Sequence, residues 1–134
     1  MPKILRKRFG QHLLTDKTSI STIVQIINPL PKDNICEIGP GLGAITLPIL
    51  KLTNKMHVVE IDRDLAKELK VNCKDVGNLI LHNVDILKFN LNNIANPNQP
   101  VRLIGNLPYN ISTPLLFHLL NFSNIIKDMH FMLQ

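Results

Sequence analysis

Strand-like apolar runs alternate with helix-like segments along most of this chain, and the first four runs each end in glycine or polar residues. The strand-like runs cover residues 34–38, 56–61, 79–82, 101–105 and 129–133, and the helix-like segments cover 16–28, 44–51, 63–73 and 113–120. This alternation with short connections predicts an α/β fold: a doubly wound, Rossmann-like parallel sheet with helices on both faces. Ligands of such sheets bind at the carboxyl ends of the strands, so the loops there are the first places to look for chemistry.

The charge and size of the chain narrow the class of protein further. Its 134 residues fit one domain, and a net charge of +5 favours a polyanionic partner. Four basic side chains cluster near the amino end, at Lys3, Arg6, Lys7 and Arg8. The cluster is typical either of a phosphate-binding segment or of a solvated terminus.

The cysteine pattern and the hydropathy indicate a cytoplasmic protein. Cys36 and Cys73 have no metal-ligand spacing, and two isolated thiols are typical of a reducing compartment. No apolar run approaches the ~20 residues of a membrane span, and no apolar signal core follows the amino end. We therefore expect no membrane association and no metal.

The first strand-like run leads into Gly39-Pro40-Gly41-Leu42-Gly43, where glycine recurs at every second position. Glycines after a strand let the backbone turn tightly and approach a ligand closely. Glu37 precedes this loop, and an acid there suits a ligand with an ammonium or sulfonium group better than a pyrophosphate. Glu60 lies at the end of the second run, 21 residues after Gly39, a spacing suited to ribose hydroxyls. Together these residues predict a nucleoside site, without choosing between a nicotinamide cofactor and S-adenosylmethionine.

The third and fourth loops offer hydrogen-bond acceptors for an adenine. Asp85 can accept from an adenine amine, or cap the helical turn that follows it. After the fourth run, the Asn106 amide oxygen and the Leu107 carbonyl can hold the two hydrogens of a target amine. Pro108 stiffens this segment, and Tyr109 can stack on a flipped-out base. The alternative is an ordinary Asn-x-Pro turn.

With these residues in place, the chain resembles the ribosomal RNA adenine dimethyltransferases over its whole length. The similarity is to the bacterial small-subunit type, which dimethylates two adjacent adenosines. The matching segments, in order, are residues 6–14, 37–43, 58–64, 83–85, 105–117 and 130–134. Six segments in the same order make the resemblance specific.

The resemblance implies S-adenosyl-L-methionine as the cofactor, bound by His12, Leu14, Gly39, Gly41, Glu60, Asp85 and Asn106. It implies that the catalytic segment is Asn106, Leu107, Pro108 and Tyr109, and that Lys3, Arg6, Lys7 and Arg8 contact RNA phosphates. RNA binding should then be sensitive to salt. His12 departs from the asparagine that often occupies its position, although imidazole can also donate or accept a hydrogen bond.

The implied reaction is an in-line attack of the adenine amine on the methyl group, repeated on the same nitrogen. It needs positioning more than a strong base, and no metal. The implied partner is small-subunit ribosomal RNA in the pre-30S particle, with the protein acting as a monomer in ribosome biogenesis.

The resemblance also bears on domain organisation, because the family carries further strands and a small helical domain. Residues 1–134 are then the amino-terminal part of the methyltransferase catalytic domain, with a sheet that is incomplete at its carboxyl end. A chain that stops at Gln134 is expected to be poorly stable and weakly active or inactive.

Four other functions compete with this interpretation. Enzymes that methylate a large-subunit adenosine share nearly the same layout, whereas DNA adenine methyltransferases arrange their motifs differently. A non-catalytic rRNA-binding assembly factor could retain the fold without cofactor affinity. A nicotinamide oxidoreductase is disfavoured by the glycine spacing and by the lack of a recognisable catalytic pair.

Overall fold

The computed structural model describes residues 16–133. Its elements are, in chain order, α2 (Lys17–Ile27), β1 (Ile35–Ile38), α3 (Thr46–Thr53), β2 (Lys55–Val59), α4 (Arg63–Asn72), β3 (Asn78–His82), the 3₁₀ turns η1 (Ile86–Lys88) and η2 (Leu91–Asn93), β4 (Val101–Leu107), α5 (Tyr109–Leu120), the 3₁₀ turn η3 (Ser123–Ile125) and β5 (Ile126–Leu133). The five strands form one parallel sheet in the order β3-β2-β1-β4-β5. The predicted α/β fold with a parallel sheet is confirmed.

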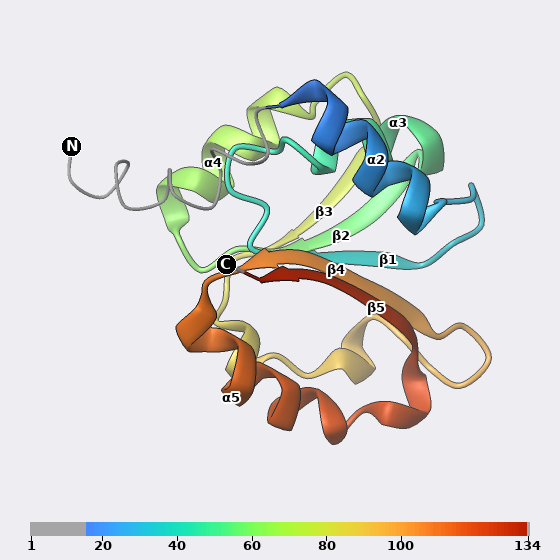
Figure 1. Cartoon of the computed structure of the whole chain (residues 1–134), viewed down its shortest axis with the longest axis vertical. Coiled ribbons are helices and arrows are strands. Elements are labelled where there is room, and N and C mark those ends of the chain that lie inside the picture. The colour runs from blue at the N-terminus through green and yellow to red at the C-terminus, as the bar shows by residue number, and fades with distance from the viewer. Residues whose placement is uncertain (1–15, 134) are drawn as a thin grey trace.

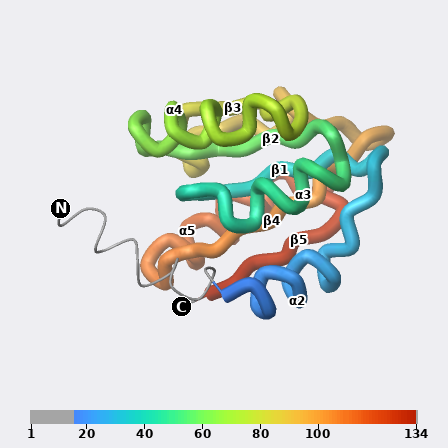
Figure 2. The backbone as a smooth tube through the Cα atoms, turned by 90° about the horizontal axis from the view of Figure 1, so that it is seen from above, coloured from blue at the N-terminus to red at the C-terminus, as the bar shows by residue number. Residues whose placement is uncertain are grey.

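Helices cover both faces of this sheet (Figure 1). One face carries α2, α3 and α4, with α4 nearest β3 and α2 nearest β5 (Figure 2). The other face carries α5 and the turns that precede β4 (Figure 1). Each face has its own apolar core: Leu50, Leu69 and Ile104 belong to the first, and Leu103 and Leu115 to the second. All four residues of β1 are buried, because β1 lies at the centre of the sheet between both cores.

Local sequence explains where α2 begins and ends. Asp16 caps its amino end by accepting a hydrogen bond from the Thr18 N–H at 3.0 Å. Asn28 closes its carboxyl end in the left-handed conformation, with φ at 48°. The predicted helix at residues 16–28 therefore agrees with α2 and its caps.

The predicted boundaries around β4 and α5 were wrong. The expected strand ended at residue 105 and the expected helix began at residue 113, with a loop between them. In the structure β4 continues to Leu107, because Asn106 and Leu107 pair with Met132 and Leu133 of β5. The helix α5 then begins at Tyr109, directly after Pro108. Only Pro108 separates the two elements.

A buried arginine joins α2 to the amino ends of β1, β4 and β5. The Arg102 guanidinium donates to Asp33 at 2.7 Å and to Asp128 at 3.0 Å. It also donates to the main-chain oxygens of Ile27 and Asn28, at the carboxyl end of α2. A cation suits that end of a helix, because the last carbonyls there carry partial negative charge. We call Arg102, Asp33 and Asp128 the arginine cluster.

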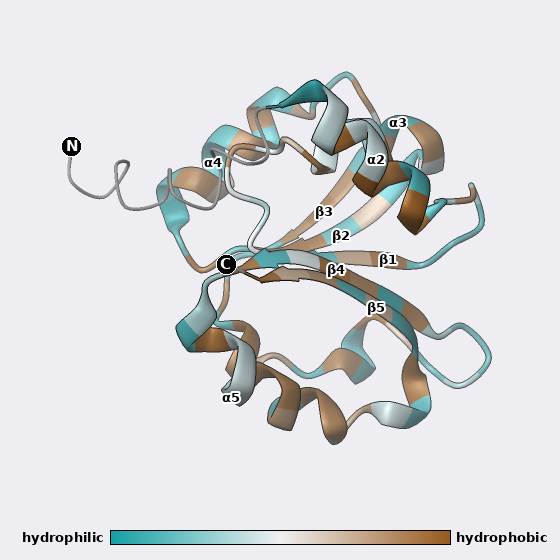
Figure 3. Ribbon diagram, in the orientation of Figure 1, coloured by the Kyte–Doolittle hydropathy of each residue, from teal (hydrophilic) through white to brown (hydrophobic). Residues whose placement is uncertain are grey.

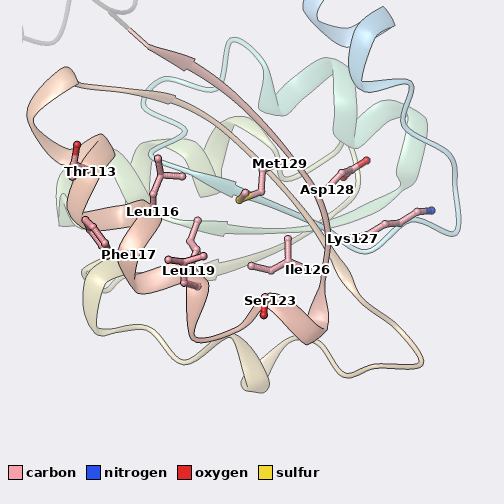
Figure 4. Close-up of a pocket in the computed structure, with 10 residues that line it drawn as sticks. Thr113, Leu116, Phe117, Leu119, Ser123, Ile126, Lys127, Asp128 and Met129 are labelled. Carbon is pink, nitrogen blue, oxygen red and sulfur yellow. The ribbon is translucent and has the colours of Figure 1, made fainter.

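The edge strand β5 and helix α5 expose apolar side chains. Figure 3 shows that the carboxyl-terminal half of α5 is largely hydrophobic. Phe117 and Leu120 of this helix are 68% and 67% exposed, and Met129 of β5 is 45% exposed. These side chains border a groove of about 660 Å³ between α5 and β5, also lined by Leu116 and Ile126 (Figure 4). The groove contains none of the residues that the sequence singles out for chemistry.

Candidate functional site

The loops singled out in the sequence lie along one edge of the sheet. They follow β1, β2, β3 and β4, which are neighbours in the order β3-β2-β1-β4. Each of these strands is parallel to its neighbour, so their carboxyl ends share that edge. The structure therefore brings the glycine loop, Glu60, Asp85 and Asn106 to the same side of the molecule.

The glycine loop after β1 depends on left-handed backbone conformations. Gly39, Gly41 and Gly43 have φ values of 66°, 58° and 92°, which side-chain-bearing residues rarely adopt. A Cβ atom placed on Gly39 would meet no other atom within 4 Å, so the loop has open space on that side. A Cβ atom on Gly43 would lie 2.7 Å from the Leu69 side chain. Gly39 therefore borders open space, whereas Gly43 lets α4 pack closely.

Glu60 directly follows β2, and its side chain is held against the glycine loop. Its Oε1 atom accepts from the Gly41 N–H at 3.2 Å, and its Oε2 atom accepts from the Asp62 N–H at 3.0 Å. The residue is 4% exposed. The carboxylate thus has a fixed position between the glycine loop and the first turn of α4.

Glu37 is a second buried acid beside the same loop. It lies in β1 and accepts a hydrogen bond from the Thr46 hydroxyl of α3. Burial raises the pKa of Glu37 to about 7; the Thr46 hydrogen bond opposes this shift, and the Glu60 carboxylate adds to it. Glu37 therefore holds its proton to a higher pH than an ordinary glutamic acid does.

Asp85 and Asn83 occupy the loop after β3. Asp85 Oδ1 accepts from the Leu87 N–H at 3.0 Å, so Asp85 caps η1, one of its two predicted roles. Asn83 donates through Nδ2 to the Glu60 oxygen at 2.8 Å and to the Ile61 oxygen at 3.2 Å. The sequence alone did not single out Asn83. The feature that could have identified it is its place after a strand, two residues before Asp85.

Asn106 is the penultimate residue of β4 and is half-buried. Side chains alternate along a strand, so Asn106 lies on the same face of the sheet as Ile104. Leu107 is buried, whereas Tyr109 is 77% exposed at the start of α5. The segment that we expected to be a loop is therefore a strand end joined directly to a helix.

Gly105 sets the approach of β4 to β1, and alanine at this position is expected to lower the free energy of unfolding by about 1–3 kcal/mol. A Cβ atom there would lie 2.8 Å from the Ile38 main-chain oxygen, which cannot move without disturbing the pairing of Ile38 with Gly105. Urea unfolding of Gly105→Ala measures the effect. Lys127→Ala, at an exposed position of β5, is the control. A loss below about 0.5 kcal/mol, typical of surface changes, would contradict it.

A histidine pair lies in the sheet beside this site. His57 Nδ1 of β2 and His82 Nε2 of β3 are 3.0 Å apart. Burial lowers the pKa of His57 to about 4, with His82 and Lys55 acting in the same direction, and burial also lowers the pKa of His82. Both rings are therefore neutral near pH 7, and their single hydrogen bond ties β2 to β3.

Other predicted features fall partly or wholly outside the described residues. His12, Leu14 and the basic residues Lys3, Arg6, Lys7 and Arg8 all lie outside them. Between residues 16 and 133, no three His, Cys, Asp or Glu side chains form a group that could hold a metal ion. In the same range, no helix is long and apolar enough to cross a membrane. Cys36 and Cys73 are buried free thiols.

Comparisons with known proteins agree with the fold. A relative from Nitrosococcus oceani, named ribosomal RNA small subunit methyltransferase A, is 55% identical over 96% of this chain and 49% of its own length. The crystal structure of the 23S rRNA methyltransferase ErmE matches with a TM-score of 0.76 and 25% identity, covering 89% of this chain and 46% of that one. A dimethyladenosine transferase from Plasmodium falciparum matches with a TM-score of 0.74 and 27% identity, covering 89% and 42%.

The chain spans about half the length of the curated relatives that it matches. The sequence model of a family described as ribosomal RNA adenine dimethylase matches residues 3–134. This match covers nearly the whole chain, including every segment of the candidate site. The chain therefore belongs to the ribosomal RNA adenine dimethylase family.

Proposed function

We propose that this chain is the amino-terminal part of a catalytic domain that binds S-adenosyl-L-methionine and dimethylates the N6 amine of adjacent adenosines in small-subunit ribosomal RNA. The observation that carries the proposal is the position of Glu60. Its buried carboxylate lies against Gly41 at the carboxyl end of β2, on the edge of the sheet that also holds Asp85 and Asn106. This is the arrangement expected for a nucleoside beside a glycine loop.

The described residues fit the cofactor. The open space beside Gly39 leaves room for a ligand to approach the main chain of the loop. Ile61, next to Glu60, is 66% exposed and offers an apolar surface that a purine ring can cover. Gly39, Gly41, Glu60, Asp85 and Asn106 would hold the cofactor within the described residues. The cofactor supplies an electrophilic methyl group when it is bound.

The residues at the end of β4 would orient the adenine amine. The Asn106 amide oxygen and the Leu107 carbonyl accept its two hydrogens and direct its lone pair toward the methyl group. The exposed Tyr109 ring provides a surface on which the flipped-out base stacks. Pro108 separates the strand from the helix, so it fixes the direction in which Tyr109 leaves the sheet.

The RNA partner is inferred from charge and from the relatives. Lys3, Arg6, Lys7 and Arg8 would bind phosphates, with small-subunit ribosomal RNA in the pre-30S particle as the partner and the bacterial cytoplasm as the compartment. The complete protein would act as a monomer, without a metal. The structural match to a 23S rRNA methyltransferase makes large-subunit RNA the competing substrate. The higher identity to small-subunit enzymes favours small-subunit RNA.

Glu60→Gln is expected to weaken S-adenosyl-L-methionine binding roughly 30-fold, because it removes a buried charge that accepts hydrogen bonds. Calorimetric titration measures the affinity, and Glu68→Gln on the exposed face of α4 is the matched control. A wild-type chain that is folded but does not bind would contradict the cofactor site. Methyl transfer to small-subunit and large-subunit RNA, assayed side by side, then identifies the substrate.

A further inference from the structure

Both main-chain hydrogen-bonding groups of Glu60 are bound by residues at the end of β3. Its N–H donates to the His82 oxygen at 3.0 Å, which continues the ladder between β2 and β3. Its carbonyl accepts from the Asn83 side chain at 2.8 Å. The carboxylate is held separately by Gly41 and Asp62. Among the described residues, Asn83 is thus the partner that reaches Glu60 through a side chain, whereas the other partners use main-chain groups.

Asn83 acts where the two strands separate. In a continued parallel ladder, the N–H of Val84 would donate to the Glu60 carbonyl. Here the Asn83 Nδ2 atom donates to that carbonyl and also to the Ile61 carbonyl, 3.2 Å away. The β3 chain is thereby free to turn into η1, which Asp85 caps. The strand ends stay joined although their main chains diverge.

This contact joins two loops that carry different parts of the candidate site. Glu60 lies at the end of β2, and Asp85 lies two residues beyond Asn83. The Asn83 side chain is a short, direct connection between them. We infer that Asn83 is a positioning residue for the nucleoside half of the cofactor, because its amide sets the separation between Glu60 and Asp85. This inference rests on the cofactor site proposed above.

The test uses the chain with two probes, S-adenosylhomocysteine and adenosine, titrated by calorimetry. Asn83→Ala removes both hydrogen bonds and is expected to weaken the binding of each probe about tenfold. Asn83→Asp keeps the shape but turns a carboxylate toward two carbonyls, so its loss is expected to be at least as large. Asn78→Ala, at the exposed opposite end of β3, is the matched control and should bind like the wild type.

Thermal unfolding of each variant separates positioning from folding. The expected result is weaker binding of both probes by a similar factor, with the Tm of Asn83→Ala close to that of the wild type. Unchanged affinity in both Asn83 variants would overturn the positioning role and leave the cofactor site standing. A loss of binding that only follows a lower Tm would also overturn it. A folded wild type that binds neither probe would overturn the cofactor site, and the inference with it.

Discussion

Replacing Arg102 with methionine is expected to lower the free energy of unfolding by about 3–5 kcal/mol. The change removes the cation of the arginine cluster while keeping the volume of the side chain. Asp33, whose side chain is 11% exposed, would then lose its cationic partner, and the main-chain oxygens of Ile27 and Asn28 would lose the donor that they share. Removing one partner of a buried ion pair costs more free energy than the intact pair contributes, because the remaining charge stays buried without a partner.

Urea unfolding at pH 7 measures this loss, and two further variants test its cause. The double variant Arg102→Met with Asp33→Asn should be more stable than Arg102→Met alone, because it removes the stranded charge. Lys127→Met, an exposed cation on the same strand as Asp128, should change stability by less than about 0.5 kcal/mol. Equal stability of Arg102→Met and the wild type would show that the cluster contributes nothing to the fold.

The pKa of Asp33 gives the same cluster a pH dependence. Burial opposes the charge on Asp33, but the Leu30 N–H and the Arg102 guanidinium outweigh it and lower the pKa. A carboxylate with a lowered pKa contributes stability that is present above its unfolded value and is lost as the pH falls through the folded value. The Arg102→Met variant should therefore lack part of the acid sensitivity that the wild type shows below about pH 4.

Replacing Glu37 with glutamine is expected to stabilise the chain by about 3 kcal/mol above pH 8, and by much less at pH 4. The pKa of Glu37 in the folded chain is about 7, against an ordinary value of 4.5. Folding therefore favours the protonated acid. This contribution is fully present below pH 4.5, and it is lost as the pH rises through 7. Glutamine is neutral at every pH, so the variant buries no charged carboxylate when it folds.

Unfolding by urea at pH 4, 6, 7 and 9 measures the difference in the free energy of unfolding between Glu37→Gln and the wild type. The difference should grow mainly between pH 5 and pH 8. Thr46→Val removes the hydroxyl that donates to Glu37, so this variant should lose more stability than the wild type as the pH rises. Glu68→Gln on α4 is the control with an exposed acid. A constant difference across the pH range would mean that Glu37 stays charged.

The general fold could be predicted because it follows from local patterns. Apolar runs bounded by glycine or polar residues predict buried parallel strands, and Asp16 and Asn28-Pro29 mark the ends of a helix in the sequence itself. The β4–α5 boundary could not be predicted in this way. Asn106 and Leu107 extend β4 because they pair with β5, and that partner is distant in the sequence. Pro114 also favours a helix that starts near residue 113, since proline is best tolerated in a first turn.

Spacing and the family resemblance proposed the residues of the candidate site, but neither predicted the contacts that hold those residues in place. The spacing between Gly39 and Glu60 suited an acid that binds ribose hydroxyls, whereas the contact of Glu60 with Gly41 is visible only in the structure. The Asn83 contact with Glu60 and the Glu37 contact with Thr46 depend on how strands and helices are placed in space. The contacts of Arg102 are equally invisible in the sequence, because its partners lie up to 75 residues away.

The strand order has a consequence for how the chain folds as it is synthesised. β1 lies at the centre of the sheet, and Cys36 pairs with His57 on one side but with Leu103 on the other. A nascent chain can therefore assemble β1, β2 and β3 early, whereas the other edge of β1 stays unpaired until β4 has been synthesised. Contacts between residues so distant in sequence are slow to form, because a long loop must close first. The edge of β1 that pairs with β4 is therefore among the last parts of the sheet to be covered during synthesis.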